Sequence, residues 1–150
     1  MLTVRREKFL DCIDQIMPLC IEVHNIVEKD VIPLPLDLDF DLYDEAEKNG
    51  QFHCLVMRLN GQPIGFHWIT YNPMPRFKGH WQAVTDAIYV QPEYRNHSEF
   101  LIKCSGEYIE QLKVTMWAVA TLDPIHRGKV WERKGFVKAE TAYMRVVKNE

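Results

Sequence analysis

The sequence contains no apolar run near the roughly 18 residues that a membrane-spanning helix needs. Its N-terminus, MLTVRREKF, is too charged for the apolar region of a signal peptide. No repeat, low-complexity tract or linker divides the chain, and 150 residues is an ordinary size for one domain. We therefore expect a single soluble domain over residues 1–150 that stays in the cytosol.

Neither sign of charge dominates, since 18 Lys and Arg stand against 21 Asp and Glu, for a formal net charge of -3. The chain thus lacks the basic surplus that sequence-independent nucleic-acid binding requires. Its four cysteines form no CxxC pair and have no matching histidine spacing, which argues against a metal site and against a disulfide framework. We expect buried free thiols at Cys12, Cys20, Cys54 and Cys104.

Apolar spacing in the first third of the chain predicts a short strand at residues 2–5 and an amphipathic helix from about Lys8 to Val27. Pro18 lies inside this helix and should bend or split it, because proline cannot donate an intrahelical hydrogen bond. A short acidic helix is expected at Asp41–Lys48, closed by Asn49-Gly50.

The rest of the chain predicts strands at 52–59 and 62–71, joined by a tight Asn60-Gly61 turn, and a long strand at 81–90. There follow a helix at about Ser98–Leu112, a strand at 114–120, a short helix at roughly His126–Lys134 and a final strand at 141–147. This order predicts an α/β fold with a mixed, mostly antiparallel twisted sheet and helices on both faces. Strand 84–90 should run antiparallel to the hairpin strands and parallel to strand 114–120, through a right-handed crossover.

Three segments resemble the GNAT N-acetyltransferases, in the order in which that family has them. IYVQPEYR resembles the V-x-P-x-Y-R that ends a long strand of the family, WERKGF resembles its Y-E-K-x-G-F, and NGQPIGF resembles its NGxxVGF hairpin. The resemblance covers about residues 52–148 and implies the acyl-CoA N-acyltransferase fold.

Three further pieces are similar to a GNAT subgroup common in tailed-phage genomes: IPLPLD, NPMPRFKGHW and TDAIYVQPEYR. This closer resemblance implies a phage protein, located in the host cytoplasm or in the virion.

The resemblance also implies acetyl-CoA as cofactor. Main-chain groups of the long strand would pair with pantetheine, and a tight loop with free N–H groups at the next helix start would face the pyrophosphate. The family's loop reads R-x-x-G-x-G, whereas this chain reads RNHSEF and so has a divergent loop. The implied cofactor-binding residues are Ile88, Tyr89, Val90, Arg95, Asn96, His97 and Ser98.

The family's general acid is a tyrosine that aligns with Trp131, whose indole N–H cannot serve as a practical acid. Tyr143, Tyr89 and Tyr94 are the candidates to replace it.

For a general base the candidates are Asp86 and His80, on or just before the long strand. Strand alternation places Asp86 on one face together with Val84 and Ile88. Four other histidines have weaker claims: His24, His53, His67 and His126. A histidine on an apolar strand, such as His67, is more often a satisfied core residue.

Two hypotheses follow. The protein is an acetyl-CoA-dependent N-acetyltransferase acting on a primary amine of a small molecule or a protein. Alternatively, it is a degenerate, non-catalytic GNAT-fold phage protein that binds a protein partner, as a virion component or a host-takeover factor.

Overall fold

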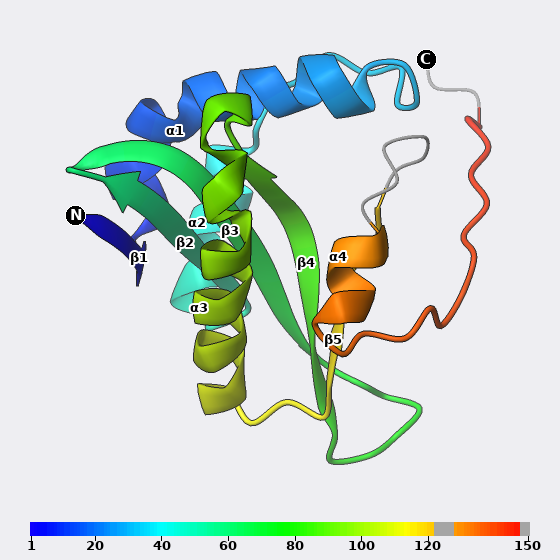
Figure 1. Ribbon diagram of the computed structural model, residues 1–150. Helices are drawn as coiled ribbons and strands as arrows, with labels where there is room; N and C mark the ends of the chain where they lie inside the picture. Colours follow the sequence, from blue (N-terminus) through cyan, green and yellow to red (C-terminus); the bar gives the residue numbers. More distant parts are fainter. Residues whose placement is uncertain (122–127, 148–150) are drawn as a thin grey trace. The chain divides into compact units, whose positions relative to one another are not determined.

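The computed structural model describes residues 1–121 and 128–147, in two compact units, Met1–Ala120 and Thr121–Glu150. The expectation of one domain stays a prediction. The first unit holds a five-stranded sheet in the order β1-β2-β3-β4-β5 (Figure 1). Its strands are β1 Leu2–Arg6, β2 Phe52–Leu59, β3 Gln62–Pro73, β4 Trp81–Val90 and β5 Met116–Ala118.

The pairing of the strands confirms the predicted mixed sheet. β1, β2, β3 and β4 pair as antiparallel neighbours, and β4 pairs with β5 in parallel. The turn between β2 and β3 has positive φ at Asn60 (50°) and Gly61 (86°), as a two-residue type I′ hairpin requires. This is why the Asn-Gly pair predicted both strands well.

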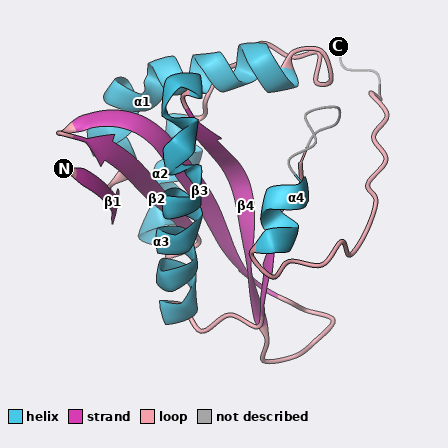
Figure 2. Ribbon diagram, in the orientation of Figure 1, coloured by secondary structure: helices cyan, strands magenta, loops and turns pink. Residues whose placement is uncertain are grey.

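Helices cover both faces of the sheet (Figure 2). α1 (Phe9–Val23), the π-helix η1 (His24–Glu28) and α2 (Phe40–Lys48) belong to one side, where Phe9, Phe52 and Trp68 share a buried aromatic cluster. α3 (Ser98–Gln111) covers the other face, and the 3₁₀-helix η2 (Pro92–His97) leads directly into it.

Of the two effects expected of Pro18, a split of the first helix is wrong, because α1 runs unbroken from Phe9 to Val23, and a bend stays a prediction. Pro18 and Asp14, four residues before it, are both exposed. The Asp14 carbonyl, which loses its helical partner at this proline, is therefore on the side where water can replace the missing N–H.

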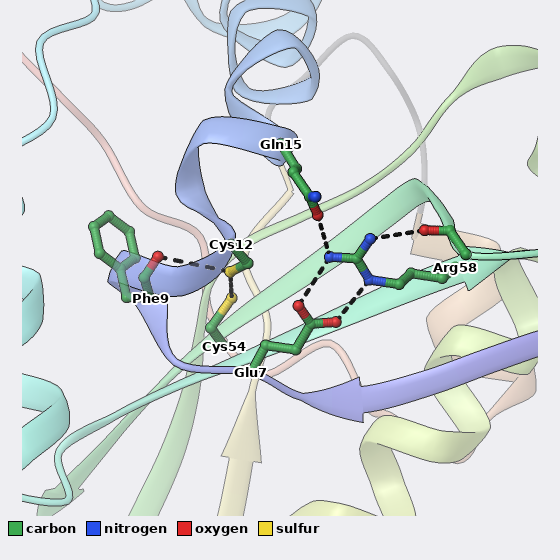
Figure 3. Close-up of polar contacts among 7 residues, drawn as sticks. Glu7, Phe9, Cys12, Gln15, Cys54 and Arg58 are labelled. Atoms are coloured by element: carbon green, nitrogen blue, oxygen red, sulfur yellow. Dashed lines mark hydrogen bonds and ion pairs between the residues drawn. The ribbon is translucent and has the colours of Figure 1, made fainter.

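Polar contacts tie α1 and the segment just before it to β2 (Figure 3). The Arg58 guanidinium of β2 donates to both carboxylate oxygens of Glu7, each at 2.9 Å, and to Gln15 Oε1 at 2.6 Å. Beside them the fully buried thiols of Cys12 and Cys54 lie 3.7 Å apart. These contacts hold α1 against β2, and α2 is in turn hydrogen-bonded to α1 through Glu47 and Phe9.

The second unit contains α4 (Gly128–Arg133), and Trp131 packs edge-to-face on Phe136 at 5.1 Å between ring centroids. The start of the predicted helix at His126 lies outside the described residues. The predicted final strand at 141–147 is wrong: this segment has no strand structure, and Tyr143 is 92% exposed. An alternating apolar pattern makes a strand only when a neighbour supplies backbone partners, and among the described residues this segment pairs with none.

Within the described ranges, no helix combines the length and apolar character that crossing a membrane requires.

Candidate active site

The site begins at an irregularity in β4. Trp68 of β3 pairs with Ala87 and the next residue, Ile69, pairs with Thr85, so Asp86 has no partner on β3. One extra residue in one strand of an antiparallel pair is a β-bulge, a device that re-aims side chains and is common beside active sites.

The bulge changes which face each side chain of β4 occupies. Asp86 reaches the hydroxyl of Tyr43, on α2. Ile88 instead packs into the cluster that contains Leu101 of α3, on the opposite face. The prediction that Asp86 and Ile88 share a face is therefore wrong, because strict alternation fails at a bulge.

The second feature is the separation of β4 from β5. Their pairing runs only from Gln82 opposite Met116 to Val84 opposite Ala118. From Thr85 onward, that edge of β4 has no strand partner among residues 1–121 and 128–147, and in Figure 1 β4 continues well past the short β5. The bulged carboxylate thus lies at the start of an edge of β4 with unpaired backbone.

Alternation along β4 identifies the main-chain groups on this edge. The N–H of Gln91 donates to Ile64 of β3, so residues at odd positions after the bulge pair with β3, and Ile88 and Val90 face the other way. Ile88 therefore presents both its N–H and its C=O at the open edge. Val90 presents its N–H, since its carbonyl accepts a hydrogen bond from Arg95 Nε at 2.6 Å.

Asp86 is exposed, yet enough protein surrounds its carboxyl group for desolvation to raise the pKa of Asp86, and repulsion from Glu28 of η1 raises it further. The Tyr43 hydroxyl, which donates to Asp86 Oδ2 at 3.1 Å, lowers this pKa and so offsets part of the rise. A carboxylate with a raised pKa is a stronger base than an ordinary aspartate.

A buried polar cluster lies on the other face of β4, directly beside the bulge. His67 is fully buried, and its two ring nitrogens contact Ser105 Oγ at 2.7 Å and Thr85 Oγ1 at 2.8 Å. The indole of Trp117 on β5 donates to the same Thr85 oxygen at 3.0 Å. Burial lowers the pKa of His67 to about 3, so the ring is neutral. The cluster thus links β3, β4, β5 and α3 where β4 and β5 part.

The segment expected to bind pyrophosphate is helical. Pro92–His97 forms η2, and the Ser98 N–H donates to the Arg95 carbonyl, so the predicted loop with free N–H groups is wrong at Ser98. Asn96 and His97 lie within the last turn of η2. The Arg95 guanidinium, besides its bond to the end of β4, lies 5.5 Å from the ring centroid of Tyr89.

Among the other predicted catalytic residues of the first unit, His80 lies away from Asp86. His80 contacts Thr115 Oγ1 at 2.7 Å and precedes Asp86 by six residues of strand, about 20 Å at the usual rise per residue. Tyr143 lies in the second unit. The Tyr89 hydroxyl is buried and has no hydrogen-bond partner within the described part of the chain, whereas Tyr94 lies partly buried in η2.

All four cysteines are free; Cys12, Cys20 and Cys54 are buried as expected, and Cys104 is half-buried. No group of three or more His, Cys, Asp or Glu side chains in the described ranges could hold a metal ion. An open cavity of about 600 Å³ lies instead at α1 and the β2–β3 turn, where Arg58 and Gln91 help to line it and Asp86 does not.

The mixed sheet, in which α3 connects β4 to the parallel β5, has the fold of the GNAT acetyltransferase structures that match this chain. The structure of ribosomal-protein-alanine N-acetyltransferase from Brucella melitensis biovar Abortus 2308 matches with a TM-score of 0.78 and 18% identity, covering 99% of each chain. A transcriptional regulator from Bacillus halodurans C-125 matches with a TM-score of 0.76 and 14% identity, over 98% of this chain and 100% of that one.

AAC(6')-Iy, solved in complex with the bisubstrate analogue CoA-S-monomethyl-acetylneamine, matches with a TM-score of 0.65 and 17% identity, covering 99% of each chain. No protein-family model matches the chain, and no curated protein matches it in sequence. The likeness to these structures shows the fold.

Proposed function

We propose that the protein is an acetyl-CoA-dependent N-acetyltransferase that acts on a primary amine of a small molecule or a protein. One observation carries the proposal: the Asp86 carboxylate lies on the bulge, at the point from which β4 has no strand partner on its β5 side within the described residues. A proton acceptor and a row of unpaired main-chain groups thereby occupy one stretch of strand. AAC(6')-Iy, which shares the fold, was solved with an analogue that contains CoA.

The residues of β4 fit the pantetheine part of acetyl-CoA. Pantetheine carries two amides. The N–H and C=O of Ile88 and the N–H of Val90, which pair with no strand in the described part of the chain, can pair with these amides as a neighbouring strand would. At the pyrophosphate, the remaining guanidinium N–H groups of Arg95 are available as donors, whereas the Ser98 N–H is already used by the Arg95 carbonyl. When bound, acetyl-CoA would supply an activated acetyl thioester.

Asp86 would do the proton chemistry of the acceptor. A primary amine reacts only in its neutral form, so its ammonium must lose a proton before attack. The Asp86 carboxylate would take that proton, directly or through water, and its raised pKa brings it closer to the pH at which the protein works. Tyr143 stays the sequence-based prediction for the proton donor to the leaving sulfur.

Thermal unfolding with acetyl-CoA, together with turnover on a panel of primary amines, tests this function. A ligand at 100 times its dissociation constant stabilises the folded state by about 2.7 kcal/mol, which raises the midpoint measurably. Asp86→Asn should keep that stabilisation and lower turnover by about 100-fold or more. Equal turnover in wild type and Asp86→Asn would remove Asp86 from the mechanism.

One observation favours the non-catalytic alternative. The helical turn at η2 uses the Ser98 N–H, and Arg95 Nε is bound to the end of β4, so fewer donors remain for a pyrophosphate. If this alternative holds, acetyl-CoA will not shift the unfolding midpoint and no amine will be acetylated. The protein would then act through a protein partner, as a virion component or a host-takeover factor of a phage.

A further inference from the structure

Tyr43 contributes to the candidate site from a distant part of the sequence. It lies on α2, 43 positions before Asp86, and its hydroxyl donates to Asp86 Oδ2 at 3.1 Å. This hydrogen bond joins α2 to the bulge of β4.

The ring of Tyr43 is fixed among other aromatic rings. It stacks on Phe9 with 4.8 Å between centroids and a 20° angle between planes, and its centroid lies 4.8 Å from Phe52 and 5.1 Å from Trp68. α2 is itself fastened to α1, because the Glu47 carboxylate accepts the Phe9 N–H at 3.0 and 3.2 Å. A ring packed in this way leaves its hydroxyl one position, so the donor is preorganised.

The charged and titratable groups that act on Asp86 come from two neighbouring elements. Glu28 of η1 repels the carboxylate, and Tyr43 of α2 stabilises its ionised form. Burial and the nearby Asp86 charge raise the pKa of Tyr43, so its hydroxyl stays protonated and can only donate to the carboxylate.

We propose that Tyr43 is a positioning residue for acetyl transfer, which holds Oδ2 of Asp86, keeps the carboxylate ionised and leaves Oδ1 to take the acceptor proton. This role rests on the proposed function. The alternative is a purely structural Tyr43–Asp86 contact that only helps α2 to pack. Such a contact would not set the pH at which Asp86 loses its proton.

Tyr43→Phe separates the two, because it removes one oxygen and keeps the stacked ring. A hydrogen bond to a charged group of ordinary strength corresponds to a change of about 1 to 2 pH units in the midpoint of Asp86 ionisation. The acid limb of kcat against pH should therefore move up by that amount, with the KM for acetyl-CoA unchanged. Thermal unfolding would verify that the variant is folded.

Tyr71→Phe is the matched control. The Tyr71 hydroxyl donates to the Leu112 carbonyl at 3.5 Å, and its ring stacks on Trp81, so it loses an equivalent oxygen without a contact to Asp86. Its pH profile should match that of the wild type. An unchanged midpoint in an active, folded Tyr43→Phe protein would overturn the positioning role and leave the proposed function standing.

An NMR titration of the Asp86 carboxyl carbon, assigned with Asp86→Asn, makes the test independent of turnover. We expect the same upward move of the Asp86 midpoint in Tyr43→Phe. A wild-type protein that acetylates no amine would overturn the proposed function and this role together, whatever the titration shows. Equal midpoints in the two titrations would overturn the role of Tyr43 alone.

Discussion

Because His67 is buried in its neutral form, we expect the protein to be less stable in mild acid than at neutral pH. Burial lowers the pKa of His67 from 6.5 to about 3, so between these values the unfolded chain binds a proton that the folded chain does not. The free energy of unfolding must then fall with falling pH, by about 1.4 kcal/mol per pH unit. From pH 6.5 to about pH 5 the loss is about 2 kcal/mol, a large part of the 5–15 kcal/mol typical of a domain.

Urea denaturation at about pH 7.5 and about pH 5, for wild type and His67→Gln, measures this loss. The lowered pKa of His53 acts in the same direction and the raised pKa of Asp86 in the opposite one, but both groups are present in the two proteins and cancel in the comparison. Glutamine hydrogen-bonds without titrating, so the variant should lose about 2 kcal/mol less than wild type over this range, whatever its absolute stability. Equal losses would refute the assignment of acid sensitivity to His67.

Three substitutions test the packing around the site by chemical denaturation. Gly65→Ala would bring a Cβ to 2.8 Å from the Tyr89 carbonyl oxygen, a main-chain atom that cannot give way. The free energy of unfolding should therefore fall by about 1 to 3 kcal/mol, and a smaller fall would show that β3 and β4 can separate. Gly106→Ala, in α3, would place a Cβ at an ordinary contact distance, 3.8 Å, from the Trp117 ring. It should raise the free energy of unfolding by about 0.5 to 1 kcal/mol, and a decrease would contradict the described packing of α3. Asp39→Ala removes the side-chain cap that accepts the Leu42 N–H at 3.0 Å and should cost about 1 kcal/mol, whereas an unchanged midpoint would mean that α2 does not depend on its cap.

Local sequence signals predicted most of the first unit because turn residues and prolines mark where several of its elements end. The Asn60-Gly61 pair set both hairpin strands, and Gln91-Pro92 ended β4 where predicted. The interpretation of His67 as a satisfied core residue is confirmed, since both of its ring nitrogens have partners.

Long-range features of the site could not be predicted in this way. Nothing in WQAVTDAIYV signals a bulge, because the extra residue is defined only against the register of β3. Tyr43 lies in an acidic helix with no site motif, and only the packing of that helix on α1 brings its hydroxyl to Asp86. The segment 141–147 failed as a strand for a related reason, since an apolar alternation does not reveal whether a pairing partner exists.

The bulge at Asp86 makes this position of β4 tolerant of a deletion that would disrupt an ordinary strand. Thr85 pairs with Ile69 and Ala87 pairs with Trp68, so removing residue 86 would leave two neighbouring pairs in regular register. Ile88 and Val90 would still pack with α3, and Tyr89 would stay in the aromatic cluster, because the faces on the two sides of the bulge already match those of a strand without the extra residue. Chains that diverge from this one can therefore lose the bulge and its carboxylate together without rebuilding either layer of the core.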